Sequence, residues 1–305
     1  MAIITPAEFN PDHVTMHSKM SGVIPTDIRT DLVKRIMAQS TVMQLAYPVD
    51  MAGKREVEYG VLEDTAKSYV VGEGQVIPTT KLDFAKHKMK AVKIATMILT
   101  SREFLEYTMS DFFDVVKIPL AAAQYRKFDE LALVDADNEW DDSITKAVAA
   151  EAIQGDITVE NFDNLLAKVY DNGHKPNAIV SVNGNYTGLN SMIRDRNGYK
   201  QPLYDRNNES VDGFKVFTLD AKTDIPKGSL FLGDWDYARY AIPYNMTYAI
   251  STEATISSVV DEQGNPINLF ERELMVLRVV MDAAFGITDP KAFAVLKDAE
   301  EPVVP

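Results

Sequence analysis

The sequence predicts a mixed α+β fold, and three observations lead to that prediction. Residues 54–99 alternate polar and apolar side chains in two runs, a pattern typical of two long strands joined by a wide loop. From about Ser110 to Val134 apolar residues recur at spacings of three or four, which indicates one long helix. Residues 156–243 mix helical and strand-like segments and predict a compact α/β unit.

Composition limits the classes of protein that fit. The chain has 305 residues, a formal net charge of −14 and no cysteine. Its length suggests one large or two ordinary domains, and without cysteine it has neither disulfides nor thiolate metal ligands. Its negative charge opposes non-specific binding to DNA or to anionic membranes. The most apolar run, Leu274–Phe285, contains Arg278 and Asp282 and is shorter than the about 20 residues that a membrane span needs.

The N-terminal region and the long helix each carry a turn or break signal. Residues 1–25 are polar and rich in turn residues, so we expect an arm that is ordered only by docking. A helix capped by Thr26 or Asp27 should follow and should end by Pro48. Pro119 lies inside the long helix and should kink it or mark a break.

The second strand of the predicted hairpin is basic although the chain as a whole is acidic. Its lysines are Lys81, Lys86, Lys88, Lys90 and Lys93. In a strand the even-numbered ones share one face, while His87 and Met89 share the other. This lysine stripe is either a solvated strand face or a surface that pairs with acids on another copy of the chain. Exposed ion pairs are worth only ~0.2–1 kcal/mol each, so they would set register while apolar burial supplied affinity.

An acidic run between Phe128 and Asp142 is the candidate partner of those lysines. Its carboxylates are Asp129, Glu130, Asp135, Asp137, Glu139, Asp141 and Asp142. Part of the run looks like a calcium-binding loop, but Trp140 occupies the required glycine position and Lys146 the closing glutamate position. We therefore expect a solvated loop there and no metal site.

No motif supplies a catalytic or cofactor site. The pair Gly72-x-Gly74 has Ile77 where a dinucleotide-binding fingerprint has its third glycine, and no helix follows, so it predicts a turn. Ser143-x-x-Lys146 lacks the partner motifs of penicillin-binding enzymes, and the four histidines are scattered. We expect no catalytic residues, no cofactor and no bound metal.

The arm and the hairpins indicate a subunit of an assembly. Gly264-Asn265-Pro266 predicts a turn that joins strands over residues 245–260 and 269–285 into a second long hairpin. The arm, the wide hairpin and this second hairpin all expose backbone and apolar surface that one copy cannot cover. This pattern suits a self-assembling subunit better than a lone enzyme.

Four segments carry a family resemblance: YVVGEG at Tyr69–Gly74, TSREFL at Thr100–Leu105, YDRNNESVDGFKVF at Tyr204–Phe217 and ITDPKAFAVL at Ile287–Leu296. In this order and spacing they resemble the major capsid proteins of tailed bacteriophages, which share the fold named after phage Hong Kong 97. The third segment looks closest to long-tailed phages of Gram-positive hosts. The resemblance covers essentially the whole chain.

The resemblance implies a domain plan. Its parts are an N-terminal arm (1–48), an extended β-hairpin loop that lies across a neighbouring subunit (49–100), a peripheral domain with a long spine helix and a long β-hairpin (101–155 and 244–305) and an inserted α/β axial domain (156–243). The turn with Gln263, Gly264 and Asn265 would contact the equivalent turns of other subunits where three capsomers join.

The implied function is a major capsid protein that self-assembles as hexamers and pentamers into the icosahedral head shell around the double-stranded DNA genome. The implied partners are other copies of the chain, a separate scaffolding protein, a portal and weakly contacted DNA, with no membrane. The protein would reside in the virion after assembly in the host cytoplasm, without covalent cross-links and with little or no N-terminal cleavage. The alternatives are an encapsulin-type nanocompartment shell and, in another class, a soluble α/β enzyme or ligand-binding protein.

Overall fold

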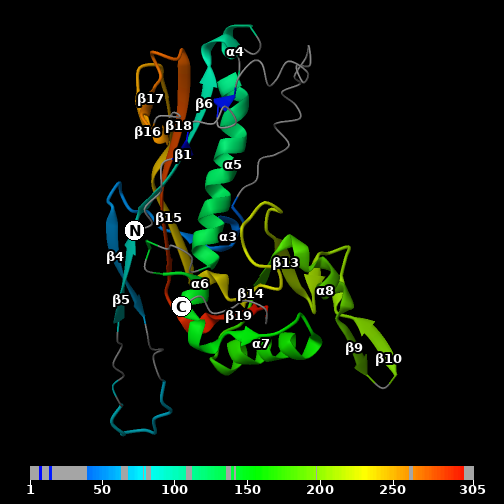
Figure 1. The fold of residues 1–305 in the computed structure, drawn as a ribbon. Coiled ribbons are helices and arrows are strands. Elements are labelled where there is room, and N and C mark those ends of the chain that lie inside the picture. Colours follow the sequence, from blue (N-terminus) through cyan, green and yellow to red (C-terminus); the bar gives the residue numbers. More distant parts are fainter. Residues whose placement is uncertain are drawn as a thin grey trace. The chain divides into compact units, whose positions relative to one another are not determined.

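The computed structural model describes residues 7–8, 14–15, 40–62, 68–77, 79, 84–107, 112–134, 139–140, 142–196, 198–260 and 264–298 (Figure 1). Helices and strands are mixed, as the sequence predicts. The chain divides into two compact units. Unit 1 comprises residues 1–40, 93–128 and 244–282, and unit 2 comprises residues 41–92, 129–243 and 283–305.

Unit 1 is built on the long helix α5 (Phe112–Leu133) and the strands β6 (Val92–Ser101), β15 (Ala238–Ser251) and β18 (Leu274–Ile287). Leu120 of α5 packs against Leu277 and Val279 of β18, so the helix covers one face of the sheet (Figure 1). The predicted long helix is confirmed, and it continues through Pro119 without a break. A short helix, α4 (Arg102–Tyr107), follows β6. No helix in the described part of the chain is both long and apolar enough to cross a membrane.

The turn predicted at Gly264 in the second hairpin is confirmed. The strand expected over residues 245–260 is interrupted at residues 252–254, and a short separate strand precedes the one expected over residues 269–285. Strands β16 (Thr255–Val260) and β17 (Pro266–Asn268) pair antiparallel, and Gly264 between them has a φ of +82°, a conformation that favours glycine. Ile256 and Ile267 are buried in a cluster with Leu274. Two short N-terminal strands, β1 (Ala7–Glu8) and β2 (Val14–Thr15), add parallel to β16 and β6 respectively. The other residues of the arm before Ser40 lie outside the described residues.

A seven-stranded sheet forms the centre of unit 2. Its strands in spatial order are β11 (Tyr204–Asp205), β12 (Ser210–Val211), β13 (Phe214–Thr218), β8 (Ala178–Ser181), β14 (Leu230–Gly233), β19 (Phe293–Lys297) and β7 (Ile153–Gln154). The sheet therefore draws two of its strands, β7 and β19, from outside the 156–243 segment. The central strands β8 and β14 are buried along their whole length.

The predicted α/β unit begins with an amphipathic helix, α7 (Val159–Asp171). The Thr158 side chain accepts a hydrogen bond from the Asn161 N–H and caps its start, and Gly173 at φ +84° follows its end. Phe162, Leu165 and other apolar residues of the helix pack on the sheet core. Short helices α6 (Ile144–Ala147) and α8 (Tyr186–Ser191) and the 3₁₀ turns η2 to η5 (Ala149–Glu151, Asn183–Asn185, Trp235–Tyr237, Pro290–Ala292) complete this part.

The polar segment after α8, whose composition predicts a loop, instead forms a hairpin, so a prediction from composition is wrong there. Strands β9 (Ile193–Arg196) and β10 (Tyr199–Pro202) pair antiparallel. Gly198 has a φ of +84° and donates its N–H to Asp195 Oδ1 at 2.9 Å, which stabilises the tight turn. The polar composition of the segment hid the strand signal because both faces of β10 are exposed.

The wide hairpin belongs to unit 2. Strand β4 (Glu56–Leu62) pairs with β5 (Phe84–Lys90) from Glu56 opposite Lys90 to Leu62 opposite Phe84. The sequence predicts one strand over 82–99, whereas the chain leaves strand pairing at Ala91 and starts β6 at Val92. Upstream, residues 40–48 are the described part of the predicted 26–48 helix. Helix α3 occupies only Thr41–Leu45, and Tyr47–Pro48 instead form strand β3, which runs parallel to β15.

Candidate functional site

The charged face of the β4–β5 hairpin carries part of the lysine stripe. Lys86 and Lys88 are exposed and Lys90 is partly exposed, and these even positions share one face as predicted. The Lys88 Nζ lies 2.7 Å from Glu56 Oε2, and its hydrogen bond and positive charge lower the pKa of that carboxyl. Glu58 stands directly opposite Lys88 in the ladder. Two glutamates of β4 therefore offset part of the lysine charge within the hairpin itself.

The opposite face of the hairpin is anchored within unit 2. Met89 is buried with Met51, Ala241 and Ala284, and the rings of Tyr59 and His87 stack with centroids 6.0 Å apart. A Cβ added to Gly286 of β18 would lie 3.1 Å from Met89 Cγ. The base of the hairpin thus fits against a backbone position that carries no side chain.

The loop at the far end of the hairpin exposes apolar side chains. Tyr69, Val70, Val76 and Ile77 are 49%, 106%, 91% and 74% exposed. Gly74 has a φ of +77°, and the Gln75 N–H donates to the Gly72 carbonyl, so the predicted turn at Gly72-x-Gly74 is confirmed. Contiguous exposed apolar side chains of this kind mark a surface that binds another molecule. Residues 68–77, called the tip loop below, are therefore a candidate interaction surface.

Two carboxylates of the acidic run have roles inside the subunit. Asp129 is 5% exposed and accepts hydrogen bonds from the backbone N–H groups of Thr41 at 2.9 Å and Val42 at 3.1 Å. It therefore caps α3 from a distant part of the chain. Glu130 accepts a hydrogen bond from the Asp224 N–H at 2.7 Å.

The prediction of a solvated loop is wrong at the far end of the acidic run, where Trp140 is buried and Asp142 is hydrogen-bonded within the fold. Asp142 accepts the Ile287 N–H at 2.8 Å, and burial raises the pKa of its carboxyl to about 6 against the opposing effects of that bond, His87 and Lys146. Burial likewise raises the pKa of Tyr59 to about 12, and its hydroxyl has no hydrogen-bond partner in the described structure.

The remaining predicted contact residues are partly described. Glu139 in the acidic run, Lys93 on β6, and Gly264 and Asn265 at the β16–β17 turn are exposed. Lys81, Asp135, Asp137, Asp141 and Gln263 lie outside the described residues. The structure thus brings the lysines together with Glu56 and Glu58, which sequence reasoning missed. The alternation of glutamates at positions 56 and 58 is the signal that could have found them.

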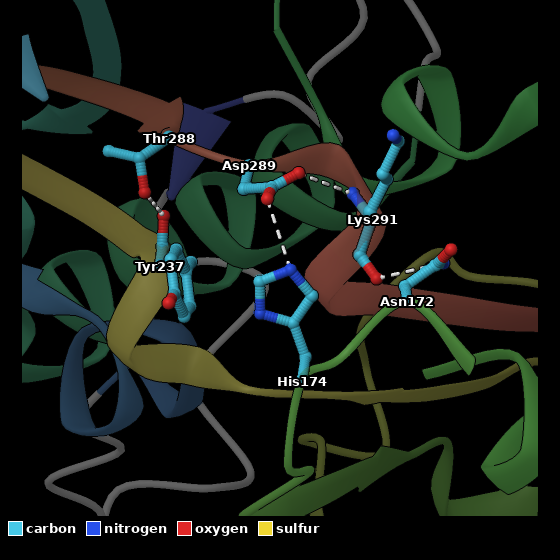
Figure 2. A network of polar contacts seen from close by, with 6 residues as sticks. All are labelled: Asn172, His174, Tyr237, Thr288, Asp289 and Lys291. Carbon is cyan, nitrogen blue, oxygen red and sulfur yellow. Dashed lines mark hydrogen bonds and ion pairs between the residues drawn. The ribbon is translucent and has the colours of Figure 1, made fainter. Parts of the chain in front are cut away.

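A polar network beside the start of β8, the end of β14 and the start of β19 involves one of the scattered histidines (Figure 2). The His174 Nε2 lies 3.0 Å from Asp289 Oδ2, and the His174 ring meets Tyr237 edge-on with centroids 4.7 Å apart. Asp289 Oδ1 also accepts the Lys291 N–H, and Thr288 donates its hydroxyl to the Tyr237 carbonyl. These contacts connect the segments that contain His174, Tyr237 and Thr288–Asp289, and their role is structural. The described residues contain no group of three potential metal ligands.

Comparison with known proteins identifies the class. The model of the phage capsid family matches residues 21–298, and this chain belongs to that family. It is 35% identical over 301 residues to the major capsid protein of Staphylococcus phage 80alpha, an alignment that covers 98% of this chain and 92% of that protein. The chain is thus a phage major capsid protein, a structural component of the virion that forms the head shell.

Solved structures agree in fold. A chain from Mycobacterium phage Bobi has a TM-score of 0.70 at 20% identity and covers 98% of this chain and 100% of its own. A chain from Mycobacterium phage Adephagia has a TM-score of 0.69 at 20% identity, with coverages of 94% and 98%. At such identities the likeness supports the capsid fold alone.

Proposed function

We propose that this chain assembles as hexamers and pentamers into an icosahedral head shell that encloses a double-stranded DNA genome. The observation that carries the proposal is the tip loop, whose exposed apolar side chains need a second surface to cover them. Burial of apolar surface supplies most of the free energy of protein association. In a subunit of this family, such an exposed apolar loop supports contact with other copies of the chain.

The proposed domain plan follows the expectation from the sequence. Residues 1–48 form the arm, 49–100 the extended loop, 101–155 with 244–305 the peripheral domain, and 156–243 the axial domain. The exposed Gly264–Asn265 turn supports a contact where three capsomers meet. We retain Lys86, Lys90 and Lys93 as cations that contact a neighbouring copy, with Glu139 as the exposed carboxylate of the acidic run.

The proposed partners are further copies of the chain, a separate scaffolding protein and a portal, with assembly in the host cytoplasm. Contact with the packaged DNA is weak and salt-sensitive, because a net charge of −14 opposes the accumulation of phosphate contacts. We infer that the chain has no catalytic activity and binds no cofactor.

Electron microscopy of the protein co-expressed with its scaffolding protein tests the proposal. The expected result is closed icosahedral particles, and a small discrete oligomer under all conditions would contradict it. Particles formed in the absence of DNA that recruit an enzyme as cargo would favour the encapsulin alternative. Boiling in SDS should release a single species of 34.0 kDa, whereas a covalent ladder would refute the absence of cross-links.

A further inference from the structure

The base of the β4–β5 hairpin meets the rest of unit 2 at a small group of partly buried ionisable side chains. Tyr59 of β4 and His87 of β5 stand directly opposite each other in the ladder, and their rings stack with centroids 6.0 Å apart. Asp142 lies immediately before α6, and its carboxylate accepts the Ile287 N–H of β18 at 2.8 Å. The junction therefore combines two ionisable side chains of the hairpin with one from another part of unit 2.

The backbone of β18 at Gly286 shows how close these groups lie. A Cβ added to Gly286 would be 3.6 Å from the Tyr59 hydroxyl and 3.1 Å from Met89 Cγ. The next residue, Ile287, donates the N–H that Asp142 accepts. The Tyr59 hydroxyl and the Asp142 carboxylate thus lie against the same short stretch of β18, which the hairpin approaches where the chain carries no side chain.

The junction is a poor place for the negative charge of Asp142. Burial is the largest effect on the pKa of this carboxyl and raises it to about 6, although the Ile287 N–H, His87 and Lys146 act to lower it. The Tyr59 hydroxyl is buried without a hydrogen-bond partner among the described residues. Ionisation of Asp142 therefore opposes the close fit of the hairpin against β18.

The other titratable and charged groups around Asp142 come from each element of the junction. His87 lies on β5, Tyr59 on β4 and Lys146 on α6, while Arg239 of β15 acts on Tyr59. Lysine, arginine and tyrosine keep their charge state between about pH 5 and pH 8, whereas an imidazole and a buried carboxyl change theirs. A rise in pH across this range adds the charge of the carboxylate and removes the opposite charge of an imidazolium.

We propose that Asp142 and His87 form a pH-sensitive latch that holds the base of the β4–β5 hairpin on the rest of unit 2 at mildly acidic pH and weakens at neutral pH. When Asp142 ionises, water must reach its carboxylate. The hairpin is the element that opens, because β4 and β5 pair with no other described strand and their movement breaks no larger sheet. The latch is a property of the single chain and does not rest on the shell function.

Linkage gives the direction and the size of the effect. A carboxyl whose pKa is raised in the closed state stabilises that state fully below its ordinary pKa, and the stabilisation is lost as pH rises through the raised value. With the ordinary value of 3.8 restored in the open state and a value of about 6 in the closed state, opening is about tenfold more favourable at pH 7.5 than at pH 5.

Hydrogen exchange of the full chain, read by mass spectrometry, tests the latch. Protection factors, corrected for the intrinsic pH dependence of exchange, are compared at pH 5 and pH 7.5 for the peptide that covers Phe84–Lys90. The wild type should lose protection about tenfold at the higher pH, and Asp142→Asn should show equal protection at both pH values. Constant protection in the wild type would overturn the proposal, as would a pH dependence that persists in Asp142→Asn.

Two controls separate the latch from general effects. The central strand β8 (Ala178–Ser181) is buried along its length and reports on global unfolding, so its protection should change much less. An equal loss in β8 and in the hairpin would mean that the whole unit is destabilised, which contradicts a local latch. Glu139→Gln alters an exposed carboxylate of the same acidic run and should keep the wild-type response; loss of the response in this variant would also contradict the assignment to Asp142.

His87→Gln tests the second member of the latch. The variant removes an effect that lowers the pKa of Asp142, so the loss of hairpin protection should move to higher pH. An unchanged midpoint would overturn the pairing of the two residues. Failure of the wild type to form particles would refute the shell function and leave the latch standing, whereas a hairpin insensitive to pH would refute only the latch.

Discussion

The carboxylate of Asp142 accepts a hydrogen bond from the backbone N–H of Ile287 at 2.8 Å, although the two residues are 145 positions apart in the sequence. This bond ties the loop after α5 to the end of β18 within unit 2. Nearby, Trp140 donates its Nε1–H to the Ala283 carbonyl at 3.0 Å. The last residues of the acidic run are thereby held in the fold as a structural element.

The pH dependence of stability follows from the raised pKa of Asp142. Burial raises this pKa from 3.8 to about 6, so the folded state holds the proton more tightly than the unfolded state. The contribution of this group to stability is fully present below pH 4 and is lost as pH rises through about 6. Asp142→Asn should therefore gain stability relative to the wild type between pH 4 and pH 7, by an amount on the order of 2 kcal/mol. Urea unfolding of both proteins at pH 4 and at pH 7 measures this change. If the difference in free energy of unfolding between Asp142→Asn and the wild type were the same at both pH values, the buried-carboxyl account would be contradicted.

Three glycines predict a graded series of stabilities. A Cβ on Gly233 would lie 2.3 Å from Phe293 Cδ1 and 2.9 Å from the Ala292 carbonyl oxygen, so Gly233→Ala should cost about 3 kcal/mol or more. A Cβ on Gly286 would lie 3.1 Å from Cγ of the unbranched Met89 side chain and 3.6 Å from the Tyr59 hydroxyl, so Gly286→Ala should cost about 1 kcal/mol. Gly60→Ala has open space and should change the free energy of unfolding by less than about 0.5 kcal/mol. Chemical unfolding of the three variants checks the order, and the reverse order would show that the strand packing is misjudged.

Asp129 and Glu139 should behave differently when truncated. Asp129→Ala leaves the N–H groups of Thr41 and Val42 without their acceptor, so it should lower the free energy of unfolding by about 2 kcal/mol. Glu139 is exposed, and Glu139→Ala should be nearly neutral for the isolated subunit. Thermal unfolding of both proteins makes the comparison. Equal, small effects would mean that Asp129 is not the cap of α3.

The lysine stripe can be tested with its internal partners taken into account. The triple variant Lys86→Glu, Lys88→Glu, Lys90→Glu should fold but form no shells. In the triple variant the new glutamates face Glu56 and Glu58. A quintuple variant that adds Glu56→Lys and Glu58→Lys therefore restores opposite charges across the hairpin. Shells counted by electron microscopy should stay absent from both variants. Normal shells from the triple variant would refute an intersubunit role for the lysines. Shells from the quintuple variant but not from the triple variant would show that the lysines act by pairing with glutamates of their own hairpin.

The elements with strong local signals were predictable from the sequence. The α7 helix has a capping threonine, an apolar face and a terminal glycine. The 22 residues of α5 carry apolar side chains on all sides of the helix, and its alanines and leucines favour helix formation. The two predicted turns at Gly74 and Gly264 depend on a backbone angle that glycine adopts most readily. These features are encoded within a few neighbouring residues.

Features that depend on distant contacts could not be predicted in the same way. The roles of Asp129 and Asp142 arise from backbone N–H groups 88 and 145 positions away, and nothing in the acidic run distinguishes them from solvated neighbours. The break at Ala91 and the β9–β10 hairpin reflect strand pairing rather than composition. The candidate site was found only in part, because its lysines were visible in the sequence while their proximity to Glu56 and Glu58 depends on the register of β4 against β5.

The β9–β10 hairpin pairs with no other described strand, β10 is exposed throughout, and its ladder closes at Gly198. A peptide inserted at that turn would lengthen this two-stranded ribbon and leave the packed interior of unit 2 unchanged, so the turn is a position at which the fold tolerates added length.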